Sequence, residues 1–273
     1  MRAEAIVAGS DEGRLMNLTS FSVLTFDCYG TLIDWETGIH RALANLIGRT
    51  GRRYSPDQAL EAFARHESEQ EAETGAMPYP ELLSMVYTRL AGEWGVEATR
   101  DEADAFGASV PDWPEFPDSR DALCYLKRFY RLVILSNVDR ASFRGSNARL
   151  GVEFDAIYCA SDIGSYKPSL RNFEYMIDHV RAELGFGPES ILHTAQSLFH
   201  DHEPANRIGL ASAWIDRRHA ASGWGATLPP ANAPRYAFRF ESMAAMANAH
   251  RLDGQAAPLE IPRTLPFVSR SPE

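Results

Sequence analysis

Short apolar runs rich in β-branched residues alternate with longer amphipathic stretches over most of the chain. Six runs have the length and composition of buried strands, at residues 21–26, 131–136, 157–160, 190–194, 211–215 and 235–240. Apolar side chains recur at helical spacing between the later runs, at residues 118–129, 139–149, 169–184 and from about 203. This alternation predicts an α/β fold with a doubly wound parallel sheet and helices on both faces.

A purely helical block interrupts the alternation after the first strand. Its apolar residues recur at helical spacing over residues 36–50, 56–73, 79–94 and 99–109. The block ends in VPDWPEFPDS at 110–119, whose prolines indicate a stiff linker. We therefore predict an all-helical cap inserted into a core domain. The predicted boundaries are 17–33 and 113–250 for the core, 34–112 for the cap, and 1–16 and 251–273 for terminal extensions.

Composition narrows the functional classes. The net charge of −10 argues against general nucleic-acid binding, which needs a basic surface. No run approaches the roughly 18 apolar residues of a membrane span, and the N-terminal segment lacks the apolar stretch of a signal peptide. Cys28, Cys124 and Cys159 are far apart and form no CxxC pair, as in a reduced compartment. We expect a cytoplasmic protein that binds neither nucleic acid nor membranes.

The segment FSVLTFDCYGTLIDW at 21–35 carries the first candidate for chemistry. An apolar run ends abruptly in Asp27, and a turn with a glycine follows at once. Open α/β sheets bind ligands at the C-terminal ends of their strands. A carboxylate that only caps the next element would also fit this place. That alternative explains one Asp, but not the full order D-x-Y-G-T-L-x-D.

Three later segments complete a set of polar strand ends: LVILSN at 132–137, YKP at 166–168 and ILHTAQSLFHD at 191–201. Together with Asp27, their order resembles the haloacid dehalogenase (HAD) superfamily over about residues 20–245. The resemblance implies a Rossmann-like core with its site between core and cap. It also implies that Asp27 is a nucleophile that forms an ester with the substrate.

Two positions resemble the 2-haloacid dehalogenases more than the phosphatases of this superfamily. The phosphatases usually carry a second Asp two residues after the nucleophile, to protonate the leaving alcohol. Tyr29 stands there, and its ordinary pKa of about 10 prevents that role near neutral pH. A halide needs no proton to leave. Metal-dependent members usually carry an acid where this chain has Gln196, and an amide is a poor substitute as a Mg²⁺ ligand. We expect no metal and no cofactor.

The resemblance also implies roles for the other motif residues. Lys167 should keep Asp27 ionised, and Asp201 should activate water, although Asp201 also has the place of a helix cap. Ser136 and Asn137 should bind the substrate carboxylate, although both residue types favour N-caps. The remaining members of the predicted binding set are Tyr29, Thr31, Gln196, Ser197 and His200.

One arginine of the cap is predicted to receive the leaving halide. Arg65 in FARHESEQ aligns loosely with the cap arginine of the dehalogenases, with Arg52 and Arg53 as reserves. The Trp that usually precedes it is Ala64 here. Other departures from the dehalogenase pattern are Phe173, Leu198 and His200, so we expect a remodelled pocket. The histidines at 193, 200 and 202 do not form a convincing metal site, and we expect His193 to be buried.

The predicted reaction is hydrolytic dehalogenation of a short 2-haloacid. Asp27 attacks the halogen-bearing carbon and expels halide, and water then opens the ester to give the 2-hydroxy acid. The partner is a small anionic 2-haloacid, and a homodimer is compatible with the sequence. Two alternatives stay open: a Mg²⁺-dependent phosphatase acting on a small phosphorylated metabolite, with Asp201 alone holding the metal, and a non-catalytic ligand-binding protein of the same fold.

Overall fold

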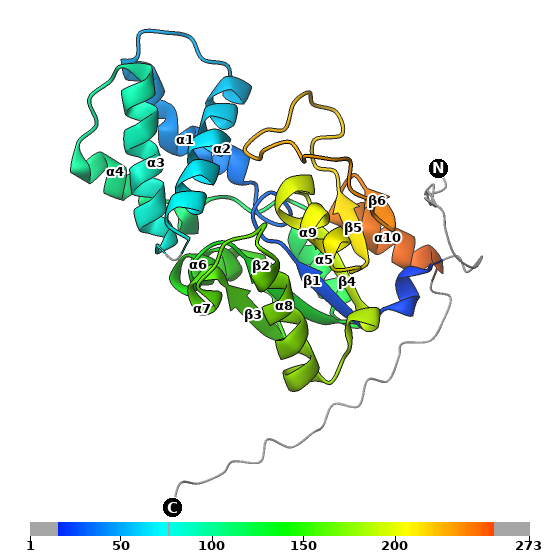
Figure 1. The fold of residues 1–273 in the computed structure, drawn as a ribbon. Coiled ribbons are helices and arrows are strands. Elements are labelled where there is room, and N and C mark those ends of the chain that lie inside the picture. The colour runs from blue at the N-terminus through cyan, green and yellow to red at the C-terminus, as the bar shows by residue number, and fades with distance from the viewer. Residues whose placement is uncertain (1–15, 76, 254–273) are drawn as a thin grey trace, which may run out of the picture.

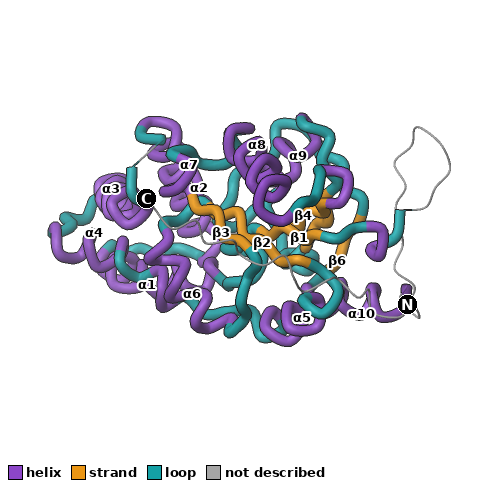
Figure 2. The backbone as a smooth tube through the Cα atoms, turned by 90° about the horizontal axis from the view of Figure 1, so that it is seen from below, coloured by secondary structure: helices purple, strands orange, loops and turns teal. Residues whose placement is uncertain are grey.

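A six-stranded parallel sheet forms the centre of the molecule (Figures 1 and 2). The computed structural model describes residues 16–75 and 77–253, so the predicted terminal extensions lie almost entirely outside the described residues. The strand order is β3-β2-β1-β4-β5-β6. The strands are β1 (Val23–Phe26), β2 (Arg131–Ser136), β3 (Ala156–Cys159), β4 (Ile191–Ala195), β5 (Ser212–Ile215) and β6 (Phe238–Phe240).

Successive side chains of the central strands enter two separate apolar cores. Leu24 and Phe26 of β1 pack on one face of the sheet, whereas Val23 packs on the other. The first face is covered by α5 (Ser119–Leu126), α6 (Arg140–Leu150) and α10 (Met243–Asp253), and the second by α7 (Ala160–Ile163), α8 (Leu170–His179) and α9 (Glu203–Arg207). Both faces of the sheet are therefore buried, as expected for a parallel sheet with crossover helices.

Four helices form a group of their own beside the strand ends (Figure 1), and we keep the name cap helices for them. They are α1 (Trp35–Arg49), α2 (Pro56–Glu73), α3 (Tyr79–Trp94) and α4 (Arg100–Gly107). Ser55 and Thr99 cap α2 and α4 with reciprocal side-chain bonds, which satisfy the free N–H groups of the first turn. No helix in the described part of the chain is long and apolar enough to cross a membrane.

The predicted doubly wound α/β class is confirmed, and the predicted strands and cap helices lie close to their observed bounds. The short helix α7 has no counterpart in the prediction. The helix predicted at 169–184 is α8 followed by a π-helical turn at Val180–Leu184, and a second π-helical turn at Leu198–His202 precedes α9. Single 3-10 turns lie at Leu18–Ser20, Val110–Asp112 and Pro188–Ser190. The domain boundaries at 33/34 and 112/113 stay a prediction.

Candidate active site

Asp27 lies one residue beyond β1, at the C-terminal edge of the sheet. A tight turn follows it, in which Gly30 has a φ of +90°, a backbone conformation that residues with a side chain rarely adopt. The turn brings Thr31 back so that its hydroxyl donates to Asp27 Oδ2 at 2.6 Å. The backbone N–H of Gln196 donates to the same hydroxyl oxygen at 2.9 Å. The hydrogen bonds of this turn therefore link the C-terminal ends of β1 and β4, where Asp27 lies.

Lys167 joins two carboxylates at the centre of the site. Its buried Nζ donates to Asp27 Oδ1 at 2.9 Å, to Asp201 Oδ1 at 2.7 Å and to the Leu135 carbonyl at 3.1 Å. Burial alone would lower the pKa of Lys167, but the charges of Asp201 and Asp27 outweigh it and raise the pKa above its ordinary value. The ammonium therefore stays charged and holds both carboxylates in fixed positions.

The two carboxylates differ in their environment. Burial raises the pKa of Asp27, and the attraction of Lys167 offsets this only in part. Both oxygens of Asp27 accept a hydrogen bond, which is the geometry of its ionised form. Burial acts in the same sense on Asp201, but the charge of Lys167 and the bond from His193 outweigh it and lower the Asp201 pKa. Asp201 is therefore ionised at neutral pH.

A buried histidine fixes one oxygen of Asp201. His193 Nε2 lies 3.0 Å from Asp201 Oδ1, and its Nδ1 lies 2.9 Å from the hydroxyl of Thr25. Thr25 is the register partner of His193 across β1 and β4. Asp201 Oδ2 has no hydrogen-bond partner in the described structure. The sequence analysis predicted that His193 is buried but missed its contact with Asp201; polar residues at facing positions of two buried strands were the available signal.

Tyr29 packs into the interior beside the site. Its hydroxyl lies 2.8 Å from Ser146 Oγ of α6, and its ring meets Trp113 edge-on at a centroid distance of 5.7 Å. Burial raises the pKa of this phenol well above its ordinary value. The side chain nevertheless lines the cavity described below. Tyr29 therefore borders the cavity but is a very weak acid.

Ser136 and Asn137 lie in two different environments. Asn137 Oδ1 accepts from the Lys167 N–H at 2.7 Å, and its Nδ2 donates to the Lys167 carbonyl at 3.1 Å. The amide thus binds the backbone of Lys167 and holds this residue in place. Ser136 Oγ is buried without a partner in the described structure. Its hydroxyl is the polar group of this pair that is open to a ligand.

The fourth motif surrounds the other side of the site. Ser197 Oγ accepts from the His200 N–H and lies 2.9 Å from Thr227 Oγ1. Burial lowers the pKa of His200 to about 4, so its ring is neutral at neutral pH. His200 Nε2 lies 3.7 Å from Glu71 Oε2. The side-chain carbonyl of Gln196 is buried without a partner in the described structure.

Arg217, which was not predicted as a site residue, supports the turn between Asp27 and Thr31. Its Nε and Nη2 donate to the Thr31 carbonyl at 3.1 and 2.9 Å, and its Nη1 pairs with Asp118 at 2.8 Å. Arg217 follows β5, far from the turn in sequence, and one arginine among many gives no local signal of such a contact. It acts on the site through the backbone of Thr31.

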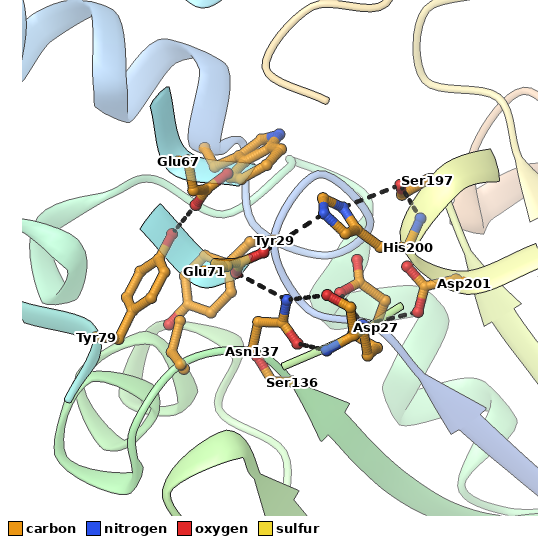
Figure 3. Close-up of a pocket in the computed structure, with 13 residues that line it drawn as sticks. Asp27, Tyr29, Glu67, Glu71, Tyr79, Ser136, Asn137, Ser197, His200 and Asp201 are labelled. Atoms are coloured by element: carbon orange, nitrogen blue, oxygen red, sulfur yellow. Dashed lines mark hydrogen bonds and ion pairs between the residues drawn. The ribbon is translucent and has the colours of Figure 1, made fainter. Parts of the chain in front are cut away.

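A cavity of about 30 Å³ lies at this site, between the core and the cap helices (Figure 3). The core contributes Asp27, Tyr29, Ser136, Asn137, Val138, Lys167, Ser197, His200 and Asp201, and the cap helices contribute Trp35, Glu67, Glu71 and Tyr79. None of these four residues of the cap side was predicted from the sequence. Glu67 and Glu71 continue the apolar stripe of Leu60, Phe63 and Ala64 on α2, and acids within such a stripe were a usable signal.

The predicted halide residue Arg65 lies elsewhere. Its Nη2 donates to both carboxylate oxygens of Glu93 at 2.9 and 2.7 Å, on an exposed part of α2. It lines a second, wider hollow with Tyr54, Trp94 and Trp224. Arg52 and Arg53 are exposed as well. The structure therefore does not bring these arginines together with Asp27, and no arginine is among the described residues that line its cavity.

The donor set near Asp27 is a poor fit for Mg²⁺. Among the described residues, no group of three His, Cys, Asp or Glu side chains has the arrangement of a metal site. Asp27 Oδ1 and Asp201 Oδ1 both accept from Lys167, so a positive charge already lies between them. Gln196 offers an amide oxygen where a third carboxylate would serve a hard cation better.

Comparisons with known proteins identify the family. The model of haloacid dehalogenase-like hydrolases matches residues 21–193. The chain therefore belongs to this family of hydrolases, which confirms the resemblance found in the sequence. No curated protein matches the chain.

Solved structures confirm the fold. A defluorinating L-2-haloacid dehalogenase aligns with a TM-score of 0.69 at 20% identity, over 86% of this chain and 98% of its own. L-2-haloacid dehalogenase from Xanthobacter autotrophicus, with chloropropionic acid covalently bound, aligns with a TM-score of 0.68 at 17% identity, over 86% and 100%. The HAD-hydrolase YfnB from Bacillus subtilis, bound to magnesium, aligns with a TM-score of 0.65 at 18% identity, over 85% and 99%. At these identities, the likeness shows the fold and not the substrate.

Proposed function

We propose that the protein hydrolyses the carbon–halogen bond of short 2-haloacids through an ester on Asp27. One observation carries the proposal: Asp27 lines a cavity together with Lys167 and Asp201, while Tyr29 occupies the place of a leaving-group acid and is buried against Ser146. A buried carboxylate oriented by Lys167 and Thr31 suits nucleophilic attack on carbon. A halide leaves without a proton, so Tyr29 need not act as an acid.

In the first step, an oxygen of Asp27 attacks the halogen-bearing carbon from the side opposite the halogen. A new carbon–oxygen bond forms as the carbon–halogen electron pair leaves as halide. The hydroxyl of Ser136 is free to donate to the substrate carboxylate. Trp35 and His200 line the cavity and are therefore better placed than Arg65 to contact the halide.

In the second step, Asp201 takes a proton from water through its free oxygen, Oδ2. The hydroxide adds to the carbonyl carbon of the Asp27 ester, and the bond between that carbon and the substrate oxygen breaks. The proton then passes to the departing alkoxide, which leaves as the 2-hydroxy acid. Lys167 and His193 both hold Asp201 Oδ1, which leaves Oδ2 free to accept the proton.

Halide release with and without a chelator tests this proposal. The enzyme is incubated with 2-chloropropionate or p-nitrophenyl phosphate, each with excess EDTA or with Mg²⁺. We expect chloride release that EDTA leaves unchanged, because the donor set near Asp27 fits Mg²⁺ poorly. Phosphate release that needs Mg²⁺ would instead support the phosphatase alternative. Ligand binding without turnover of either compound would support the non-catalytic one.

A further inference from the structure

The cap side of the cavity is formed by two buried acids one helical turn apart. Glu67 and Glu71 of α2 are 3% and 7% exposed, and both face the site (Figure 3). The hydroxyl of Tyr79 donates to Glu67 Oε1 at 2.5 Å, and Asn137 Nδ2 donates to Glu71 Oε1 at 2.9 Å. Among the described residues, nothing donates a hydrogen bond to the second oxygen of either carboxyl. Glu67 Oε2 is therefore available to a ligand, whereas Glu71 Oε2 lies 3.7 Å from Nε2 of the neutral His200 ring, too far for a hydrogen bond.

The charges around the cavity favour a cation on this side. Four carboxyl groups line it, from Asp27, Glu67, Glu71 and Asp201. Among the described lining residues, Lys167 carries the permanent positive charge, and its Nζ already donates hydrogen bonds to Asp27 and Asp201. When Glu67 and Glu71 are ionised, a second anionic group on the cap side would meet their charges with no cation to compensate. A positively charged group would balance them.

Unpartnered polar atoms on the core side indicate a polar ligand independently of these acids. Ser136 is 2% exposed and Asp201 is 0% exposed, yet Ser136 Oγ and Asp201 Oδ2 have no hydrogen-bond partner in the described structure. Both residues line the same cavity. Buried polar atoms are nearly always paired in folded proteins, so such atoms around a cavity mark the place of a ligand.

We propose that the substrate is zwitterionic: a short 2-haloacid that also carries an ammonium group, held by Glu67 and Glu71 on the cap side. Its carboxylate lies toward Ser136 on the core side. The reacting bond rests on the function proposed above, whereas the ammonium site rests on the cavity itself. An ammonium supplies three donors and one charge, which matches the two available carboxyl oxygens.

Protonation of the acids makes the proposal measurable. Burial raises the pKa of Glu67 to about 8 and that of Glu71 well above its ordinary value. Titratable groups that face the pair from other elements are Tyr79 of α3, Tyr166 and Lys167 of the loop before α8, and His200 of the turn after β4. An ammonium stabilises the ionised acids, so its binding releases protons and strengthens as pH rises from 6 to 8.

Binding of three unreactive probes tests the proposal. Calorimetry with the whole chain compares β-alanine, propionate and 3-hydroxypropionate, which share a carbon skeleton and differ in the terminal group. We expect β-alanine to bind at least about tenfold more tightly than the other two, since hydrogen bonds to charged groups contribute more than neutral ones. The heat should change with the buffer's ionisation enthalpy, as proton release requires. Equal affinities, or no binding of β-alanine at tens of millimolar, would overturn the proposal.

Matched variants locate the site. Glu67→Gln and Glu71→Gln should each remove most of the preference for β-alanine over propionate. Glu69→Gln on the exposed face of α2 should leave it unchanged. An unaltered preference in both cavity variants would place the ammonium elsewhere and overturn the assignment. If a variant does not fold, the three-probe comparison on the natural chain still decides. These experiments need no turnover, so they can fail while chloride is still released, or succeed when it is not.

Discussion

At the scale of single residues, one ammonium group organises the chemistry. Lys167 donates to the two carboxylates that the proposed reaction uses in succession, Asp27 first and Asp201 second. Each keeps an oxygen that Lys167 does not contact, and the partners of these oxygens differ. Asp27 Oδ2 accepts from Thr31, while Asp201 Oδ2 is free. This asymmetry favours the assignment of Asp27 as nucleophile and Asp201 as base.

Replacement of the nucleophile gives the most direct residue-level prediction. Asp27→Asn keeps the size of the side chain but removes its charge, so chloride release should fall by about 10³-fold or more. Circular dichroism should show an intact fold.

In the unaltered enzyme, one turnover in ¹⁸O water with enzyme in excess should label Asp27 and leave the product hydroxyl unlabelled. A labelled product on that first turnover would mean that water attacks the substrate directly.

At the scale of elements, α2 presents different faces to two hollows. Its acids at 67 and 71 face the cavity of Asp27, while Arg65 faces the second hollow and pairs with Glu93. Residues 65 and 67 are two apart, and positions two apart do not share a face of a helix. The helix therefore cannot present both an arginine at 65 and an acid at 67 to the same cavity, and a rotation of α2 would only exchange one for the other.

The arginine of α2 gives a prediction at this scale. Arg65→Lys should change the rate of chloride release by no more than about twofold, because an exposed ion pair outside the cavity contributes little. Steady-state kinetics on 2-chloropropionate would measure it. A large loss of turnover with unchanged stability would show that the cap moves during the reaction and brings Arg65 to the halide.

Secondary-structure elements could be predicted from the sequence better than the contacts that individual side chains make. Apolar runs and helical spacing located every strand and all four cap helices, because burial on one or both faces fixes those patterns. Motif order also located Asp27, Lys167 and Asp201, which the structure brings together. The contacts of His193, Arg217 and Glu71 depend on strand register and on packing between distant elements. Polar residues within apolar elements mark His193 and Glu71 as unusual, but such a pattern does not give their partners, so these contacts could not be predicted from the sequence.

At the scale of the whole molecule, a long connection after β5 joins the cap helices to the core. Arg218 in this connection donates to Glu36 of α1 at 2.5 Å and to Asp57 of α2 at 2.8 Å. The hydroxyl of Thr227 in the same connection contacts Ser197 beside the site. The connection thus contacts both the cap helices and the core, and its ion pairs hold the two together beside the cavity.

Removal of this link tests whether closure matters. Arg218→Ala should lower the free energy of unfolding by about 1 kcal/mol, because the partly buried carboxylate of Glu36 and the exposed one of Asp57 both lose their partner. It should also raise KM severalfold, since the cap helices no longer favour the closed position over the substrate. Urea unfolding and steady-state kinetics would measure the two effects. Arg100→Ala removes a well-exposed ion pair with Asp104 and should change neither quantity. If Arg218→Ala lowered stability as expected but left KM unaltered, the connection would stabilise the fold without controlling access to Asp27.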